Sequence, residues 1–304
     1  MAHRRSEIGV FQVDAFTDIP FGGNPALVVF STDLNDDQMM KIVDEIGPGQ
    51  TVFIGKSASA NWLFRYMTRG GEMPFSGHLT VAGFVALIDQ GLIDTSRDVS
   101  VHSLETRAGV LQIEVVHDRV TGLHEVQITH ERPTFMKTYD PHEYAMALGL
   151  SLADIMSPFP IQTVSTGVPQ LMVPVSSLRA LRRIQPNPEL LNQLQSDSDW
   201  LSIQVFTRET LDPTSDVHVR HFAPLLGIEE DPVTGSAAGS MAGYLIKYGI
   251  IAPSQPVTSI VIEQGHILGR PGKIFVEVDG DQNEIRHVKV SGKGVTVMRG
   301  TLLI

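Results

Sequence analysis

The chain has 304 residues, with 23 Lys and Arg against 34 Asp and Glu, a net charge of −11 and no cysteine. This length favours two domains. The acidic balance argues against a nucleic-acid partner, because affinity for phosphates rests on Lys and Arg, and the only tight basic cluster is His3-Arg4-Arg5. The missing cysteines exclude disulfides, thiolate metal sites and a cysteine nucleophile. Without a signal-peptide pattern or a long apolar run, we expect a cytoplasmic protein with no membrane partner.

The first half predicts short strands and two helices. Asn35 with Gln38 three residues later is a capping-box pattern, which predicts a helix that ends at the turn 47–49. Pro74-Phe75-Ser76-Gly77-His78 leads into the apolar residues 79–88, which fit a helix enclosed by protein on all sides. Strands are expected at 10–16, 26–30, 51–54, 61–68, 98–104, 108–116 and 122–128.

The second half repeats this rhythm. Residues 129–160 contain four prolines and predict a crossover around a short helix near 142–149. The acidic string 227–231 is most simply a solvated loop that ends at a helix start, and a small-residue helix follows at 237–249. We also expect polar helices between 176 and 198, and strands near 161–166, 169–175, 201–207, 216–222, 257–263, 273–279, 284–290 and 294–303.

One short pattern occurs twice. Pro74-x-x-Gly77 and Pro232-x-x-Gly235 each open an apolar helix, each follows an acidic residue, and about half the chain separates them. One interpretation is an internal repeat: two similar β-rich domains, each with one buried helix whose N-terminus meets the other's at the domain cleft. The alternative is chance, because the pattern is short.

Two helix starts at one cleft would favour an anion. The first turn of a helix offers unpaired N–H groups and a partial positive charge, which suit a carboxylate. Gly77 and Gly235 let a ligand approach the backbone closely, and Ser76, Thr234 and Ser236 add hydroxyl donors. We therefore expect a small carboxylate-bearing metabolite. Nucleotide binding is disfavoured because no Gly-x-x-x-x-Gly-Lys-Ser/Thr accompanies these residues.

The titratable groups beside these turns are His78, Asp231 and Glu72. In the first helical turn the dipole would lower the pKa of His78 and keep it neutral, which suits a proton relay. Alternatively, His78 is a buried histidine that bonds a backbone carbonyl. Asp231 either carries a proton or caps the helix near Thr234.

Three other positions have simpler explanations. Glu72 could equally be a turn residue that pairs with Arg65 or Arg69. His218 and His221 lie three residues apart in a predicted strand, so they should point to opposite faces and form no metal site. A serine-hydrolase elbow is disfavoured because Gly-x-Ser-x-Gly is missing.

Taken together, these motifs resemble the PhzF-like proteins, which are named for the phenazine-biosynthesis isomerase and are related in fold to diaminopimelate epimerase. The matching segments run in order along nearly the whole chain. They are Val13-Asp14-Ala15-Phe16, Gly23-Asn24-Pro25, Glu72 to His78, Glu230 to Gly239, Gln264-Gly265, Gly269-Arg270-Pro271, and Val290-Ser291-Gly292 with Gly294.

The resemblance implies an α+β fold of two pseudo-symmetric β-barrel-like domains, each wrapped around a central helix, with the active site between them. Residues 1–128 would form the first domain, with 290–304 returning to it, and 129–289 the second. A homodimer without cofactor or metal is expected. The epimerase branch uses two cysteines as acid and base, which this chain cannot do.

One position departs from the family pattern. The phenazine enzyme carries its proton on a glutamate in Ser-Glu-Thr-Thr-Phe, and the matching segment here is Gly49-Gln50-Thr51-Val52-Phe53. The carrier position is therefore Gln50. An amide has no useful pKa near neutrality, so it only donates and accepts hydrogen bonds.

We therefore expect a cofactor-independent isomerase or epimerase that moves a proton on a small carboxylate, either amino-acid-like or cyclic. In this hypothesis His78 and Asp231 carry the proton and Gln50 orients the substrate. The residues expected to bind substrate are Asn24, Glu72, Ser76, Gly77, Thr234, Gly235 and Ser236. The alternative is a non-catalytic protein that keeps the fold and binds a metabolite or a protein partner.

Overall fold

The computed structural model describes residues 7–31, 33–47 and 49–304. His3-Arg4-Arg5 and Pro48 of the expected turn lie outside this range. The chain divides into two compact units: the residues up to Ile128 together with Ser291–Ile304, and Thr129–Val290. No helix in the described part has the length and apolar character that a bilayer crossing requires.

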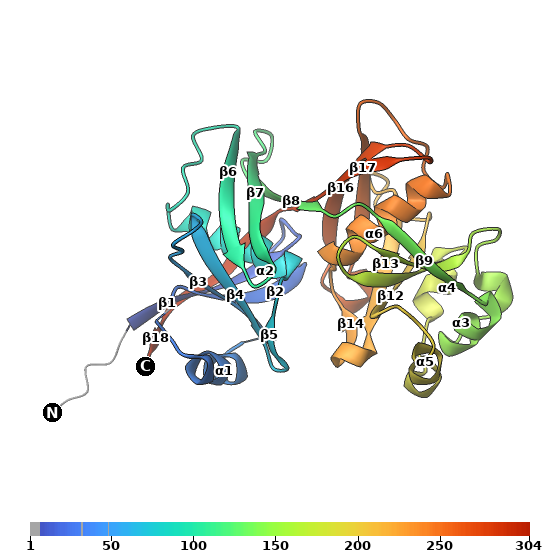
Figure 1. Ribbon diagram of the computed structural model, residues 1–304, viewed down its shortest axis with the longest axis horizontal. Helices are drawn as coiled ribbons and strands as arrows, with labels where there is room; N and C mark the ends of the chain where they lie inside the picture. The colour runs from blue at the N-terminus through green and yellow to red at the C-terminus, as the bar shows by residue number, and fades with distance from the viewer. Residues whose placement is uncertain (1–6, 32, 48) are drawn as a thin grey trace. The chain divides into compact units, whose positions relative to one another are not determined.

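Unit 1 is a β-rich layer wrapped around one helix (Figure 1). The first strand pairs antiparallel with both β2 and β18, so the end of the chain completes the sheet at its beginning. The elements of this unit are β1 (Glu7–Ala15), β2 (Asn24–Val29), α1 (Asp36–Glu45), β3 (Gln50–Gly55), β4 (Trp62–Thr68), β5 (Gly71–Met73), α2 (Gly77–Asp89), β6 (Val99–Thr106), β7 (Gly109–His117), β8 (His124–His130, continuing into unit 2) and β18 (Gly294–Leu303).

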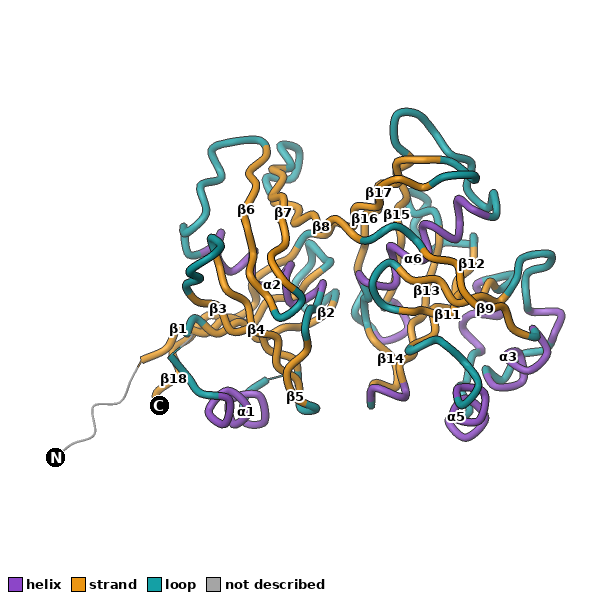
Figure 2. Tube along the Cα trace, in the orientation of Figure 1, coloured by secondary structure: helices purple, strands orange, loops and turns teal. Residues whose placement is uncertain are grey.

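Unit 2 has the same plan, with α6 as its enclosed helix (Figure 2). Its elements are β9 (Thr134–Tyr139), α3 (Pro141–Ala147), η1 (Leu152–Asp154), β10 (Ile161–Ser165), β11 (Pro169–Pro174), α4 (Leu178–Arg183), α5 (Pro188–Gln195), β12 (Ser202–Thr207), β13 (Val217–Ala223), η2 (Pro224–Leu226), β14 (Ile228–Asp231), α6 (Gly235–Lys247), β15 (Thr258–Gln264), η3 (His266–Leu268), β16 (Gly272–Gly280) and β17 (Ile285–Gly292, continuing into unit 1).

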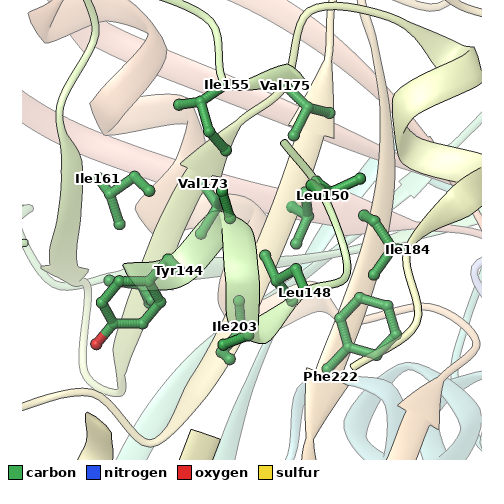
Figure 3. Close-up of a cluster of buried hydrophobic side chains, with 14 of the residues drawn as sticks. Tyr144, Leu148, Leu150, Ile155, Ile161, Val173, Val175, Ile184, Ile203 and Phe222 are labelled. Carbon is green, nitrogen blue, oxygen red and sulfur yellow. The ribbon is translucent and has the colours of Figure 1, made fainter. Parts of the chain in front are cut away.

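The sheet of unit 2 is covered on both faces. Because side chains alternate along a strand, Ile203 and Val205 of β12 point into a buried cluster with α3, α4 and α5. Figure 3 shows part of this cluster, with Tyr144 and Ile203 labelled. Phe206, on the opposite face of β12, packs edge-on against Tyr244 of α6 with ring centroids 5.7 Å apart. Helices therefore pack on both faces of this sheet, and α6 is enclosed.

The predicted helices are confirmed. Asn35 and Gln38 form the expected capping box, with the Gln38 N–H donating to Asn35 Oδ1 at 2.9 Å and the Asn35 N–H donating to Gln38 Oε1 at 3.0 Å. The helix expected at 237–249 begins two residues earlier, at Gly235. Its counterpart α2 begins at Gly77, and both helices have 13 residues that are mostly buried.

Two predictions were wrong. The crossover 129–160 contains a strand, β9, because the residues between Pro133 and Pro141 are largely β-branched or aromatic and pair with β10. The acidic string was expected to be a solvated loop, but it forms β14 against β13. Within it, Glu230 makes a largely buried ion pair with Arg220 at 2.8 Å, so pairing rather than solvation explains this acid.

Candidate active site

The first helix start lies in unit 1. Ser76 precedes Gly77, is buried, and its carbonyl accepts hydrogen bonds from the Thr80 N–H at 3.0 Å and the Thr80 hydroxyl at 2.7 Å. Within the described part of the chain, the Ser76 side chain makes no capping hydrogen bond to the helix. Its hydroxyl instead lies 3.3 Å from Nδ1 of His78. The N–H groups of the first turn therefore receive no cap from Ser76.

His78 is held neutral by its surroundings. Burial of the imidazole lowers the pKa of His78 to about 4, so the ring carries no charge at pH 7. The predicted direction is confirmed, and desolvation of the buried ring is a cause of it. Its Nε2 atom is buried and has no hydrogen-bond partner among the described residues.

The sheet of β3 and β4 packs against α2 in ordered steps. In the middle of the helix, a Cβ on Gly83 would lie 2.5 Å from the Phe64 ring and 3.3 Å from Ile54. One turn closer to the helix start, the Tyr66 and Thr80 hydroxyls are 2.7 Å apart. Moving toward the N-terminus of α2 therefore corresponds to moving toward the beginning of β3.

Gln50 lies one step further along this series. In the antiparallel register, Ile54 faces Phe64, Val52 faces Tyr66 and Gln50 faces Thr68. Because side chains two residues apart share a face, Gln50 lies on the α2 side of the sheet, at the end nearest the helix start. Gln50, which the resemblance aligns with a proton-carrying position, is therefore directed to the same region as Ser76 and Gly77.

Asn24 belongs to the same face. It begins β2, is buried, and lies opposite Ala15 of β1. Leu27 and Val29 of β2 belong to the buried cluster with α1, so Asn24 points to the α2 side.

Glu72 lies on the other face of the sheet. It is the strand partner of Met67, which packs in the cluster with α1. Arg65 Nε donates to Glu72 Oε1 at 2.9 Å and its NH2 group to Oε2 at 2.5 Å, while Arg107 adds a third contact at 2.8 Å. The structure thus selects Arg65, of the two arginines considered from the sequence, and adds Arg107. Both oxygens of this carboxylate are occupied by arginines.

The second helix start lies in unit 2, where one glutamine organises the residues before it. The Thr234 N–H donates to Gln264 Oε1 at 3.1 Å, and Gln264 Nε2 donates to the Asp231 carbonyl at 2.9 Å. The Thr234 hydroxyl donates to the Asp231 carboxylate, while Thr234 itself forms no side-chain cap within the described chain. Asp231 is thereby positioned at the start of α6.

Close backbone packing fixes this turn. Gly265 has φ +86°, and a Cβ there would lie 2.2 Å from the Arg270 carbonyl oxygen and 2.8 Å from that of Pro232. Only glycine fits this position. Gly235 and Ser236 follow Thr234 and begin α6. Gly235 is buried and Ser236 is partly exposed.

From the sequence, Gln264 and Gly265 are recognised only as a match to the family pattern, with no role assigned to them. No local signal marks Gln264, because its partners lie 30 and 33 residues away. The expected separation of the two histidines of β13 is confirmed: His218 Nδ1 lies 2.6 Å from Glu263, whereas His221 Nδ1 lies 2.6 Å from Gln204.

The chain is similar to known proteins over nearly its whole length. Residues 13–300 match the family model described as "Phenazine biosynthesis-like protein". The uncharacterized isomerase YfhB of Bacillus subtilis is 35% identical over 98% of this chain and 99% of its own length. A trans-2,3-dihydro-3-hydroxyanthranilate isomerase of Pseudomonas fluorescens is 32% identical over 96% and 98%. The crystal structure of a PhzF-family phenazine biosynthesis protein from Bacillus anthracis has a TM-score of 0.86 at 31% identity, covering 98% of this chain and 100% of the other.

Proposed function

This chain belongs to the phenazine biosynthesis-like protein family and is an isomerase, and we propose that it moves a proton on a small carboxylate without a cofactor. Relatives that match the chain over nearly their whole length are named isomerases. The observation that carries the proposal is the repeated helix start. Both 13-residue helices begin at a glycine and have no side-chain cap from the preceding residue within the described chain. Such starts favour a carboxylate.

His78 is the first proposed proton carrier. Its neutral ring can accept a proton from a carbon atom of the substrate, and its buried Nε2 has no partner among the described residues to compete. A bound carboxylate would raise the pKa of His78 from about 4, since a nearby negative charge favours the imidazolium. Substrate binding would thus bring the ring closer to the range in which it exchanges protons.

Asp231 is the second proposed carrier, and Gln50 orients the substrate. One carrier removes a proton from one carbon and becomes protonated, while the other carrier, protonated beforehand, gives its proton to a second carbon or to the opposite face. Proton exchange with solvent then returns both carriers to their starting states. The hydrogen bond from Thr234 orients the Asp231 carboxylate. Ser76, Ser236 and Asn24 are proposed to contact the substrate. That both helix starts serve one substrate stays a prediction.

Glu72 is assigned a different role. Because Arg65 and Arg107 occupy both its oxygens on the α1 face of the sheet, we propose that it holds the sheet rather than the substrate.

Solvent exchange tests the proposal. The protein is incubated in D2O with a panel of amino acids, hydroxy acids and cyclic unsaturated carboxylates, and deuterium at carbon is measured by NMR. We expect exchange on at least one compound, and a loss of about 100-fold or more in His78→Ala and in Asp231→Ala. Exchange that is equally fast in both variants would show that other groups carry the proton.

Gln50 favours one alternative, a protein that keeps the fold and binds a metabolite without turning it over. Its test uses trans-2,3-dihydro-3-hydroxyanthranilate, the compound in the name of the Pseudomonas fluorescens relative. If Gln50→Glu isomerises this compound and the parent exchanges nothing in the panel, that result would overturn the isomerase assignment and identify the parent as a binding protein. If the parent exchanges another carboxylate, the isomerase proposal holds.

A further inference from the structure

Unit 2 carries a second group of titratable side chains, formed by His218, Glu263 and His266. Each of the three offers one atom able to ligate a metal, and these atoms all lie within 4.8 Å of one another. The parallel register of β13 and β15 places His218 directly beside Glu263. His266 follows three residues later, where η3 turns back toward the same strands.

Two members of the group are rigidly held. Glu263 is fully buried, and its Oε1 and Oε2 accept the N–H groups of Leu211 at 2.6 Å and Asp212 at 3.0 Å. His218 is also buried, with Nδ1 2.6 Å from Glu263 Oε1.

The third member leaves a hydrogen-bonding capacity unused. Nδ1 of His266 is buried and has no hydrogen-bond partner among the described residues. The His266 ring lies 5.0 Å from the His218 ring, centroid to centroid, at a tilt of 41°. Buried polar atoms without partners are uncommon, and each calls for an explanation such as an ion or a water molecule.

The neighbouring charges permit a cation. Lys273, the strand partner of Glu263, is a nearby positive charge, and its Nζ lies 2.6 Å from the carboxylate of Asp212. This ion pair is partly exposed, at 35% and 38%. Asp212 therefore offsets the charge of Lys273 at the partly exposed edge of the group, whereas the negative charge of Glu263 lies within the group.

We propose that His218, Glu263 and His266 bind one divalent transition-metal ion of the zinc class. Two imidazoles with one carboxylate are a ligand set that zinc uses in proteins, whereas calcium and magnesium prefer oxygen ligands. Ligand bonds of about 2.0–2.2 Å require the separations within the group to adjust as the ion binds, and the widest of them to shorten. The partly exposed His266, on its short turn, is the member best able to move.

Such an ion would stabilise the start of α6. Gln264 and Gly265 lie between two of the ligands, Glu263 and His266. Gln264 bonds Thr234 and the Asp231 carbonyl, and Gly265 packs on Pro232. An ion that joins η3 to β13 and β15 would therefore fix the segment that positions Asp231. This inference does not depend on the proposed isomerase activity.

Metal titration of the chelator-treated full-length protein tests the proposal. Co²⁺ is titrated with detection of its visible absorption, and Zn²⁺ is then added in competition. We expect one equivalent of Co²⁺ to bind and to be displaced by Zn²⁺. The midpoint of thermal unfolding should rise in the presence of Zn²⁺, because the ion binds the folded state.

The variant His266→Ala should weaken Co²⁺ binding about 100-fold and abolish the Zn²⁺-induced rise. Because Nδ1 of His266 has no partner to lose among the described residues, the variant should fold, which circular dichroism checks. Glu263→Gln provides a second test.

His142→Ala, at an exposed histidine of α3, is the matched control. His124→Ala tests the other close pair, His117 and His124, whose rings are 4.8 Å apart. No binding by the parent, equal binding by folded His266→Ala, or loss of binding only in His124→Ala would overturn the proposal.

Discussion

Replacing Glu72 by Gln separates a structural from a catalytic role for this acid. The side chain is 7% exposed and Arg65 is 20% exposed, so solvent screens their pairing little. Charged hydrogen bonds contribute about 1.5–3 kcal/mol each, and the exposed Arg107 adds at most about 1 kcal/mol. Because glutamine keeps one acceptor oxygen, we expect Glu72→Gln to lower the free energy of unfolding of unit 1 by about 2–3 kcal/mol.

The two tryptophans make this measurable. Trp62 lies in β4, the strand that carries Arg65, whereas Trp200 lies in unit 2. In a Trp200→Phe background, urea unfolding followed by fluorescence reports on unit 1, and the midpoint should fall by about 1 M. Arg107→Gln, at a 60% exposed side chain, is the control and should cost less than about 1 kcal/mol. Deuterium exchange by Glu72→Gln should stay within about threefold of the parent. An unchanged midpoint with lost exchange would refute this reasoning.

Two further predictions concern unit 2, with Trp200 as the reporter in a Trp62→Phe background. Gln264→Met removes the acceptor for the Thr234 N–H and the donor to the Asp231 carbonyl, so the free energy of unfolding should fall by about 2–4 kcal/mol; a loss below about 1 kcal/mol would contradict this. His221 has its pKa lowered by burial to about 3, against about 6.5 when unfolded. The unfolded chain therefore binds the proton first as the pH falls through 6.5. The free energy of unfolding at pH 5 should therefore be about 2 kcal/mol lower than its value above pH 6.5. His221→Gln should remove this part of the pH dependence. Equal pH dependence of the urea midpoints in both proteins would argue against it.

Local signals predicted the elements that hold the candidate site. The capping box at Asn35 and Gln38 and the glycine starts of α2 and α6 depend on residues within one helical turn. The ordered motifs then indicated the family, which the comparisons confirm. The glycine start shared by α2 and α6 can therefore be predicted from the sequence, because a helix terminus is specified by a few neighbouring residues.

Contacts set by strand pairing could not be predicted in this way. Glu72 meets Arg107 only because β4 joins β5 and β6. His218 meets Glu263, 45 residues later, only through the parallel register of β13 and β15. A shift of one residue in that register would turn the carboxylate to the other face of the sheet. Sequence spacing alone therefore did not relate these residues.

The pairing of β18 with β1 has a consequence for synthesis. The sheet of unit 1 pairs Glu7–Ala15 with Gly294–Leu303, so it stays incomplete until Gly294–Leu303 has left the ribosome. Unit 2 is formed by one continuous segment, Thr129–Val290, and can fold as soon as that segment has emerged. We therefore expect the C-terminal half to fold first, while the N-terminal half waits with an unpaired strand edge of the kind that promotes aggregation. Chains truncated before residue 294 should lose solubility because unit 1 keeps an unpaired strand edge, whereas unit 2 should still fold.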